Sequence, residues 1–322
     1  MDQTADAIAG IRPDRLAAFA AREARRFAAS RPKTRAALEA GAGDWLGRVP
    51  MHWMRDWPMP FPLLVAKARG ARLTDLDGYG IDDFCLGDTG SMFGHSPAPV
   101  AKAVRRQARR GLTYMLPTPD ALEAGRLLTR TFGEFRWQVA TTATDANRFA
   151  LRVARAVTGR PRVLVFNGCY HGTVDDAMVA LEDGRTVNRA GLVGQVADLS
   201  ALAVAVEFND LPGVAAALAQ GDVAAILTEP VMTNSCMVLP EPGFLEGLRA
   251  LATEAGALLI LDETHTQSEG HGGYARVHGL DPDILVVGKC VAGGVPAAVW
   301  GLRPAVADRF AACDAARPSG HS

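Results

Sequence analysis

The stretch GALLILDETHT, residues 256–266, decides the fold. Its apolar part, Ala257 to Leu261, has the length of one strand and ends on an acid, Asp262. A continuous apolar run of this kind predicts a parallel strand that is covered on both faces. Ligands of open α/β sheets bind at the carboxyl ends of such strands, so we expect Asp262 to lie at a ligand site.

A second apolar run, Ile284 to Val287, lies in DPDILVVGKCVAGGVP, residues 281–296, and is followed by Lys289, one of only four lysines in the chain. A strand-end lysine with little bulk around it can lose water, which favours its neutral amine and prepares it to form a Schiff base with an aldehyde. Pyridoxal phosphate is the first hypothesis for that aldehyde. The alternative is a solvated lysine in a turn.

The acid after the first run supports the same hypothesis. An isolated buried carboxylate is costly, so Asp262 needs a partner. The protonated pyridine nitrogen of pyridoxal phosphate is a suitable one, and the ion pair keeps the ring cationic so that it can accept electrons. A helix N-cap for the following turn is the alternative role of Asp262.

Helical and apolar segments alternate over much of the chain, which predicts a mainly parallel sheet covered on both faces. The remaining strands are expected at Trp137–Ala140, Val163–Phe166 and Ala224–Leu227, and helices at Pro97–Arg110, Pro119–Phe132, Asp145–Val157, Leu211–Leu218 and Gly243–Ala255. Nearer the N-terminus we expect one amphipathic helix within residues 14–40 and a hairpin over residues 72–84 that turns at Asp77-Gly78.

These stretches resemble the class III, fold-type I pyridoxal-phosphate-dependent aminotransferases, most closely the glutamate-1-semialdehyde aminomutase branch. The resemblance is carried by LTDLDGYGIDDF (73–84), GHSPAPVAKAVRRQARRGLTYMLPTPDALEAGRLL (94–128), TTATDANRFALRVARAVTGRPRVLVFNGCYHG (141–172), ILTEPVMTNSCMVLPEPGFLEGLRALATEAGALLILDETHT (226–266) and HGLDPDILVVGKCVAGGVPAAVWG (278–301). It implies an α/β large domain at residues 86–322, with a mainly parallel seven-stranded sheet between helices. An N-terminal helix and small-domain segment are expected at residues 1–85.

A phosphate site is expected where Thr142, Ala143 and Thr144 precede the helix that begins near Asp145. Free backbone N–H groups and the positive end of the helix dipole suit a phosphate dianion there. A plain N-cap is the alternative.

The resemblance implies further contacts with the cofactor. Tyr170 is expected against the pyridoxal ring, Thr264 on the opposite face of the ring, and Asn234 at its phenolic oxygen. His265 and Glu229 are nearby candidates, for which a satisfied structural hydrogen bond is the simpler role.

One departure from the aminomutase branch concerns the substrate. Relatives of that type have a tryptophan where LGDTGSMFGH, residues 86–95, places Asp88. A buried carboxylate in the pocket favours a cationic or hydrogen-bond-donating substrate and opposes the carboxylate of glutamate semialdehyde. Asp88 and Trp53 are therefore the expected substrate contacts.

The sequence thus predicts a transaminase that moves an amino group from an amine or amino acid to a keto acid. Lys289 and Asp262 are its expected catalytic residues, with Lys289 holding the cofactor as an internal aldimine. The alternatives are an intramolecular aminomutase and a cofactor-binding fragment without turnover. Family members continue beyond the position of RPSGHS, residues 317–322, so a C-terminal small domain is expected to be missing and the full-length protein to be a homodimer.

Composition agrees with a cytoplasmic enzyme. The chain has 322 residues, 48% of them hydrophobic, and a formal net charge of −1, which gives no electrostatic reason to expect nucleic acid or an anionic membrane as partner. No apolar run is long enough for a membrane span, and no signal-peptide pattern is present. The five cysteines show neither metal-ligand spacing nor a paired framework.

Overall fold

The computed structural model describes residues 10–41 and 43–315. RPSGHS, on which the expected absence of a small domain rests, lies outside the described residues. The chain divides into two compact units, Met1–Leu86 with Phe93–Pro97, and Gly87–Met92 with Ala98–Ser322. The domain boundary expected between residues 85 and 86 stays a prediction, because the chain passes between the units more than once.

The first unit begins with two helices, α1 (Pro13–Ser30) and α2 (Pro32–Ala40), so the expectation of one helix over residues 14–40 is wrong. Pro32 has no backbone N–H, and its ring disfavours the helical conformation of the residue before it. Arg31 accordingly has φ −125° and ψ 55°. Its guanidinium donates to Asp75 at 3.1 Å, which fixes the break against the following sheet.

That sheet is antiparallel and consists of β1 (Val65–Arg69), β2 (Arg72–Asp75) and β3 (Gly80–Asp82). The predicted hairpin is confirmed, since β2 pairs with β3 around a turn in which Gly78 has φ 96°. The Asp77 carboxylate in this turn accepts hydrogen bonds from the backbone N–H groups of Lys33 and Thr34 at 2.8 and 2.9 Å. The turn therefore caps α2.

The second unit contains, within the described residues, a seven-stranded sheet of order β4-β12-β11-β10-β9-β5-β8. Its strands are β4 (Arg136–Ala140), β5 (Arg162–Phe166), β8 (Ala203–Val206), β9 (Val223–Thr228), β10 (Leu258–Asp262), β11 (Ile284–Val287) and β12 (Ala298–Leu302). β12 runs antiparallel to both of its neighbours, whereas the other pairs are parallel. The prediction of a mainly parallel sheet is confirmed. A separate hairpin is formed by β6 (Val179–Glu182) and β7 (Arg185–Asn188).

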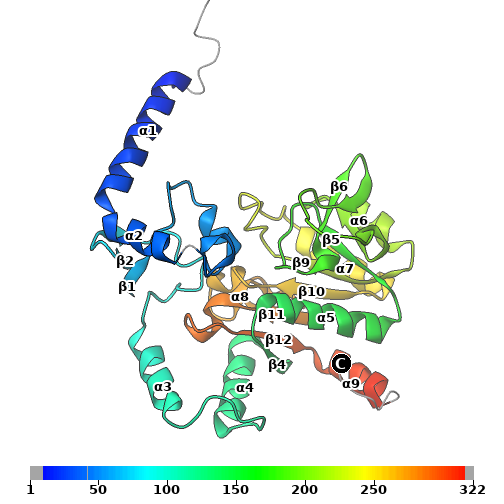
Figure 1. Ribbon diagram of the computed structural model, residues 1–322. Helices are drawn as coiled ribbons and strands as arrows, with labels where there is room; N and C mark the ends of the chain where they lie inside the picture. The colour runs from blue at the N-terminus through cyan, green and yellow to red at the C-terminus, as the bar shows by residue number, and fades with distance from the viewer. Residues whose placement is uncertain (1–9, 42, 316–322) are drawn as a thin grey trace, which may run out of the picture. The chain divides into compact units, whose positions relative to one another are not determined.

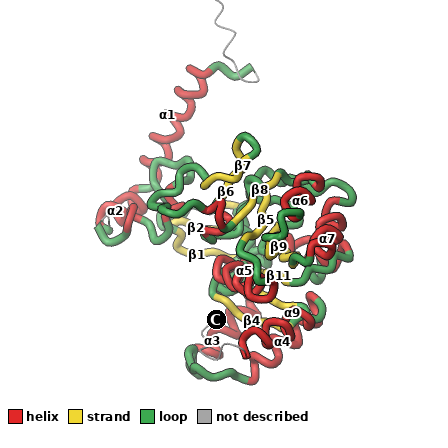
Figure 2. The backbone as a smooth tube through the Cα atoms, turned by 90° about the vertical axis from the view of Figure 1, so that its right-hand side faces the viewer, coloured by secondary structure: helices red, strands yellow, loops and turns green. Residues whose placement is uncertain are grey.

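The helices of this unit are α3 (Ala98–Ala108), α4 (Pro119–Phe132), α5 (Ala143–Thr158), α6 (Leu211–Leu218), α7 (Phe244–Ala255), α8 (Gly273–His278) and α9 (Pro304–Ala315). The connection through α5 moves along the sheet in one direction and those through α6 and α7 in the other. Right-handed crossovers then place α5 on one face and α6 and α7 on the other, and Figures 1 and 2 show the strands between these helices. Across the described residues, no helix combines the length and apolar character needed to cross a membrane.

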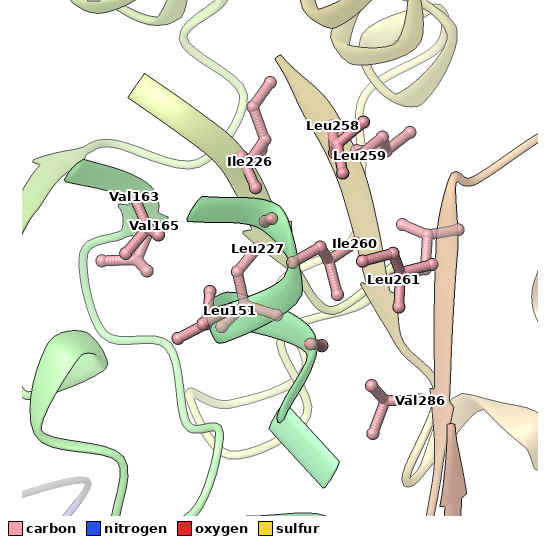
Figure 3. Close-up of a cluster of buried hydrophobic side chains, with 14 of the residues drawn as sticks. Leu151, Val163, Val165, Ile226, Leu227, Leu258, Leu259, Ile260, Leu261 and Val286 are labelled. Carbon is pink, nitrogen blue, oxygen red and sulfur yellow. The ribbon is translucent and has the colours of Figure 1, made fainter. Parts of the chain in front are cut away.

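The core lies on both faces of the central strands, against α5 on one face and against α6 and α7 on the other. β9, β10 and β11 are buried at every position. Figure 3 shows Leu151 of α5 beside Leu227 and Ile260. Replacing such a side chain by alanine typically costs about 2–5 kcal/mol, so this core holds the strand ends in fixed positions.

Candidate active site

Asp262 and Lys289 lie at the same edge of the sheet. Asp262 is the last residue of β10 and Lys289 comes two residues after the end of β11, and these two strands pair in parallel. The segments that follow them are tied together by Gln267, whose side-chain amide donates to the Thr264 carbonyl at 2.9 Å and to the Gly288 carbonyl at 2.8 Å.

Asp262 is 4% exposed and accepts three hydrogen bonds. Oδ2 accepts from Asn147 Nδ2 at 2.8 Å and from His171 Nδ1 at 2.9 Å, and Oδ1 accepts from the Thr264 backbone N–H at 3.1 Å. Burial by itself raises the pKa of Asp262, but the hydrogen bond and charge of His171 and the bonds from Thr264 and Asn147 outweigh burial and lower the pKa. The carboxylate therefore stays ionised. Asp262 holds a buried network and is not a helix N-cap, because the N-cap residue of the following 3-10 turn, Thr266–Glu269, is His265.

His171 is the main member of this network that sequence reasoning missed. Its side chain is fully buried, and its Nε2 has no hydrogen-bond partner among the described residues. Burial lowers the pKa of His171, but Cys169 and the hydrogen-bonded Asp262 carboxylate raise it, and the net direction is upward. The one sequence signal was its place directly after Tyr170 in NGCYHG.

Lys289 is not a solvated lysine in a turn. Its side chain is 22% exposed, and Nζ lies 3.2 Å from Asp88 Oδ2. The backbone of Lys289 has φ 49°, a left-handed conformation that is strained for a residue with a Cβ. Such strain is typical of functional sites.

The expectation that Asp88 is a buried carboxylate is wrong for the described chain. The Asp88 side chain is 66% exposed. Water reaches it because the segment 84–88 is exposed throughout. Desolvation of Asp88 therefore gives no argument about the substrate, whereas its charge beside Lys289 does.

His265 lies near Lys289, Asp88 and Asp262, whose charges all act on its ring. Its Nδ1 lies 3.1 Å from Thr89 Oγ1, and its Nε2 is buried without a hydrogen-bond partner among the described residues. Burial, followed by the charge of Lys289, lowers the pKa of His265, which favours a neutral ring. The structural hydrogen bond expected for His265 is thus present at Nδ1 and absent at Nε2 among the described residues.

The N-terminus of α5 begins at Ala143, two residues earlier than expected. Thr142 is its N-cap, and the Thr142 hydroxyl accepts from the Asp145 backbone N–H at 3.1 Å. This cap uses only one of the free N–H groups of the first turn, so those of Ala143 and Thr144 remain available to an anion. The N-cap and the phosphate site are therefore compatible.

Two glycines pack tightly around this helix end. A Cβ on Gly288 would lie 2.9 Å from Ala143 Cβ, and a Cβ on Gly172 would lie 2.0 Å from Thr144 Oγ1. The backbone before Lys289 and the loop after Tyr170 can approach α5 only because these side chains are absent. The structure thus brings the predicted phosphate, ring and lysine segments together.

Tyr170 and Glu229 are linked directly. The Tyr170 backbone N–H donates to Glu229 Oε1 at 3.3 Å, and Glu229 Oε2 accepts from the Thr233 hydroxyl at 2.9 Å. The simpler role expected for Glu229, a satisfied structural hydrogen bond, is confirmed. The Tyr170 side chain is 43% exposed and is available for stacking.

The other predicted contacts are less constrained. Asn234 lies exposed in the turn after Met232, and this turn is attached to the loop before Tyr170 by a 2.5 Å hydrogen bond from the Ser235 hydroxyl to the Gly168 carbonyl. Thr264 is 8% exposed, and its hydroxyl has no hydrogen-bond partner among the described residues. Trp53 lies in a 3-10 turn, His52–Arg55, of the first unit, and its role stays a prediction.

Comparison with known proteins agrees with this geometry. The family model for class-III aminotransferases matches residues 54–319. The glutamate-1-semialdehyde 2,1-aminomutase of Roseiflexus castenholzii is 40% identical over 247 residues, which are 75% of this chain and 57% of that protein. The chain thus spans little more than half the length of such relatives.

Solved structures give the same result. A glutamate-1-semialdehyde aminomutase from Pseudomonas aeruginosa is 51% identical with a TM-score of 0.91, over 93% of this chain and 66% of that one. A lysine-to-alanine variant of an aminomutase from the same organism was solved in complex with PMP. An omega-transaminase from Sphaerobacter thermophilus is 30% identical with a TM-score of 0.80, over 87% of this chain and 66% of that one. The chain belongs to the class III, pyridoxal-phosphate-dependent aminotransferase family.

Proposed function

We propose that this chain carries the active site of a transaminase that moves an amino group from an amine or amino acid to a keto acid. The observation that carries the proposal is the shared position of Asp262 and Lys289 at the carboxyl edge of β10 and β11. A buried ionised acid and a strained, partly buried lysine at one sheet edge are the two groups that such a reaction needs.

The residues present fit pyridoxal phosphate. A carboxylate has about four lone-pair positions, and Asp262 uses three, so Oδ1 can still accept a hydrogen bond from a ring N–H. The Ala143 and Thr144 N–H groups suit its phosphate. Tyr170 and Thr264 would contact the ring, and Asn234 its phenolic oxygen.

Each residue has a distinct part in the proposed mechanism. When bound, the cofactor supplies an electron sink for the carbanion formed at the substrate carbon. Asp262 holds a proton at the ring nitrogen, and His171 and Asn147 orient the carboxylate. Lys289 would bind the cofactor through its amine and, once displaced by the substrate amine, would use Nζ to take the proton from the substrate carbon and deliver it to C4′ of the cofactor.

The charge of Asp88 supports an amine donor over an acidic one. Its carboxylate lies 3.2 Å from Lys289 Nζ, at the point that a substrate must approach. A second carboxylate brought there meets like-charge repulsion, whereas an ammonium or neutral amine does not. Asp88 and Trp53 remain the proposed substrate contacts.

An intramolecular aminomutase is the second candidate. It is supported by the relatives, since the Pseudomonas aeruginosa protein at 51% identity is described as a glutamate-1-semialdehyde aminomutase. Such an enzyme needs no external keto acid, because one molecule is both donor and acceptor.

The two candidates are separated by their need for an acceptor. The cofactor-loaded protein is mixed with a panel of amines and amino acids, and conversion to the pyridoxamine form is followed by absorbance, with and without a keto acid. Turnover that requires the keto acid supports the transaminase. Formation of 5-aminolevulinate from glutamate 1-semialdehyde without it supports the aminomutase, and cofactor binding without either indicates a fragment that cannot turn over.

The proposal includes the division into residues 1–85 and 86–322, a homodimer when full length, and a cytoplasmic location. The family resemblance supports the first two. The third is supported by the five cysteines, which show no paired framework.

A further inference from the structure

A short segment of the chain, Gly87–Met92, contacts residues of the proposed active site. Three of its contacts reach the residues around Lys289. Asp88 Oδ2 lies 3.2 Å from Lys289 Nζ, Thr89 Oγ1 lies 3.1 Å from His265 Nδ1, and the sulfur of Met92 lies 3.9 Å from that of Cys290. We call this segment the strap. Each contact joins the strap to Lys289 or to a residue beside it.

The backbone of the strap is strained where Asp88 lies. Leu86, Gly87, Asp88 and Thr89 have φ values of 55°, 56°, 54° and 62°, which form a left-handed turn. This conformation is strained for a residue with a Cβ, so Leu86, Asp88 and Thr89 need contacts that offset the strain. The turn directs the Asp88 carboxylate to the lysine amine, and the ion pair is one of the contacts that hold it.

Lys289 differs in this respect from the other lysines of the chain. Lys33, Lys67 and Lys102 are exposed, and none of them forms an ion pair with another described residue. The chain therefore contains its own internal reference, because Lys67 and Lys102 have no carboxylate partner among the described residues, whereas Lys289 has one at 3.2 Å.

We propose that Asp88 is a positioning residue for Lys289. This proposal rests on the proposed function, in which Lys289 is the cofactor-binding lysine. In the cofactor-free chain the carboxylate pairs with Nζ and holds the amine at the strap. An ammonium in an ion pair has no lone pair with which to attack a carbonyl carbon, so the pair must open and the proton must pass to water before Nζ reacts. Asp88 thus sets how readily Lys289 reacts, while it contacts no reacting carbon itself.

The size of the effect follows from exposure. Lys289 is 22% exposed but Asp88 is 66% exposed, so water screens the pair. Exposed pairs of this kind change an equilibrium by at most about 5-fold. We therefore expect Asp88→Asn to accelerate the reaction of Lys289 with a neutral aldehyde roughly 2- to 5-fold.

The test uses formaldehyde with cyanoborohydride on the cofactor-free chain, and peptide mass spectrometry gives methylation of Lys289 relative to Lys67. Formaldehyde has no charge, so repulsion between Asp88 and a cofactor phosphate does not enter. Asp88→Glu keeps the charge and is expected to stay near the wild-type ratio. Asp281→Asn is the matched control, because it removes an aspartate of similar exposure, 76% against 66%, that pairs with Arg303.

Ionic strength gives a readout that a merely structural role would not move. Raising salt from about 0.01 M to about 1 M shortens the Debye length from roughly 30 Å to roughly 3 Å. The wild-type ratio is expected to rise toward that of Asp88→Asn, which itself stays constant. An unchanged ratio in Asp88→Asn, or equal salt dependence in both proteins, overturns the proposal.

A separate measurement distinguishes failure of the Asp88 proposal from failure of the proposed function. Pyridoxal phosphate is added to the wild-type chain, reduced with borohydride and mapped. A pyridoxyl group on Lys289 together with an unchanged methylation ratio in Asp88→Asn removes the role of Asp88 alone. Absence of the pyridoxyl group from Lys289 removes the function on which the role rests.

Discussion

Replacing Asp262 by asparagine should destabilise the second unit even without cofactor. Oδ2 of Asp262 accepts from both Asn147 and His171, and Oδ1 accepts from the Thr264 N–H. An asparagine has one acceptor oxygen and one donor amide, so whichever way it is turned at least one of these buried donors faces another donor. In addition, His171 loses the carboxylate that balances its charge.

The magnitude can be estimated from these contacts. A buried donor left without an acceptor costs about 1–3 kcal/mol, and breaking a buried charge pair typically costs about 3–5 kcal/mol. The two costs overlap, because the same His171 bond enters both. We therefore expect Asp262→Asn to lower the free energy of unfolding by about 3–5 kcal/mol near neutral pH.

The pH dependence identifies the cause. The folded-state pKa of His171 is raised from 6.5 to about 10, so its stabilising contribution is complete below about pH 6.5 and is lost as pH rises through about 10. The difference between wild type and Asp262→Asn should therefore shrink between these values. Urea unfolding of the cofactor-free chain, followed by tryptophan fluorescence, measures it.

Asp281→Asn serves as the control here too, with an expected cost of at most about 1 kcal/mol for an exposed pair. Equal urea midpoints for wild type and Asp262→Asn at pH 7 would refute the reasoning. A difference that stays constant up to pH 10 would show that the lost hydrogen bonds, and not the charge of His171, account for the effect.

The other predictions concern cofactor attachment and local packing. Lys289→Ala should abolish borohydride-trapped pyridoxyl labelling, whereas Lys67→Ala should retain it; peptide mapping that finds the label on another lysine contradicts the assignment. Gly273→Ala should lower the free energy of unfolding by roughly 1–2 kcal/mol for φ 77° alone, and further because its Cβ would meet Glu263 Oε2. Gly125→Ala in α4, where a Cβ meets nothing within 4 Å, should not. Burial raises the pKa of Glu263 to about 7. The contribution of the protonated Glu263 side chain to the free energy of unfolding is therefore complete below about pH 4.5 and is lost as pH rises through about 7. The urea midpoint should fall across that range, and Glu263→Gln should flatten the fall.

Sequence patterns predicted the parallel part of the sheet well, because its strands are short apolar runs bounded by turns. They did not predict β8 or β12. β8 has the sequence AVAV, whose alanines do not favour a strand, and β12 contains Gly301. Both are strands because of their neighbours, since β8 pairs with β5 and β12 fills the space between β4 and β11. Pairing over such separations leaves no local signal.

The candidate site divides in the same way. Lys289 and Asp262 could be found because each follows an apolar run, and Thr142 because it precedes a helix. The partnership of Asp262 with His171 joins residues 91 positions apart, and that of Lys289 with Asp88 depends on a left-handed turn. The residue types alone indicate neither which distant residues meet nor where the backbone turns left-handed, so these two contacts could be found only from the structure.

The place of β12 has a consequence for how the chain is made. β4 lies at the edge of the sheet and pairs only with β12, which leaves the ribosome about 160 residues later. At roughly 5–20 residues per second, β4 is without its partner strand for about 10–30 s. Lys289 lies in the segment between β11 and β12, so its edge of the sheet is completed last during synthesis. The sheet beside Lys289 is thus completed only after β12 has been synthesised, when β11 no longer has an open edge.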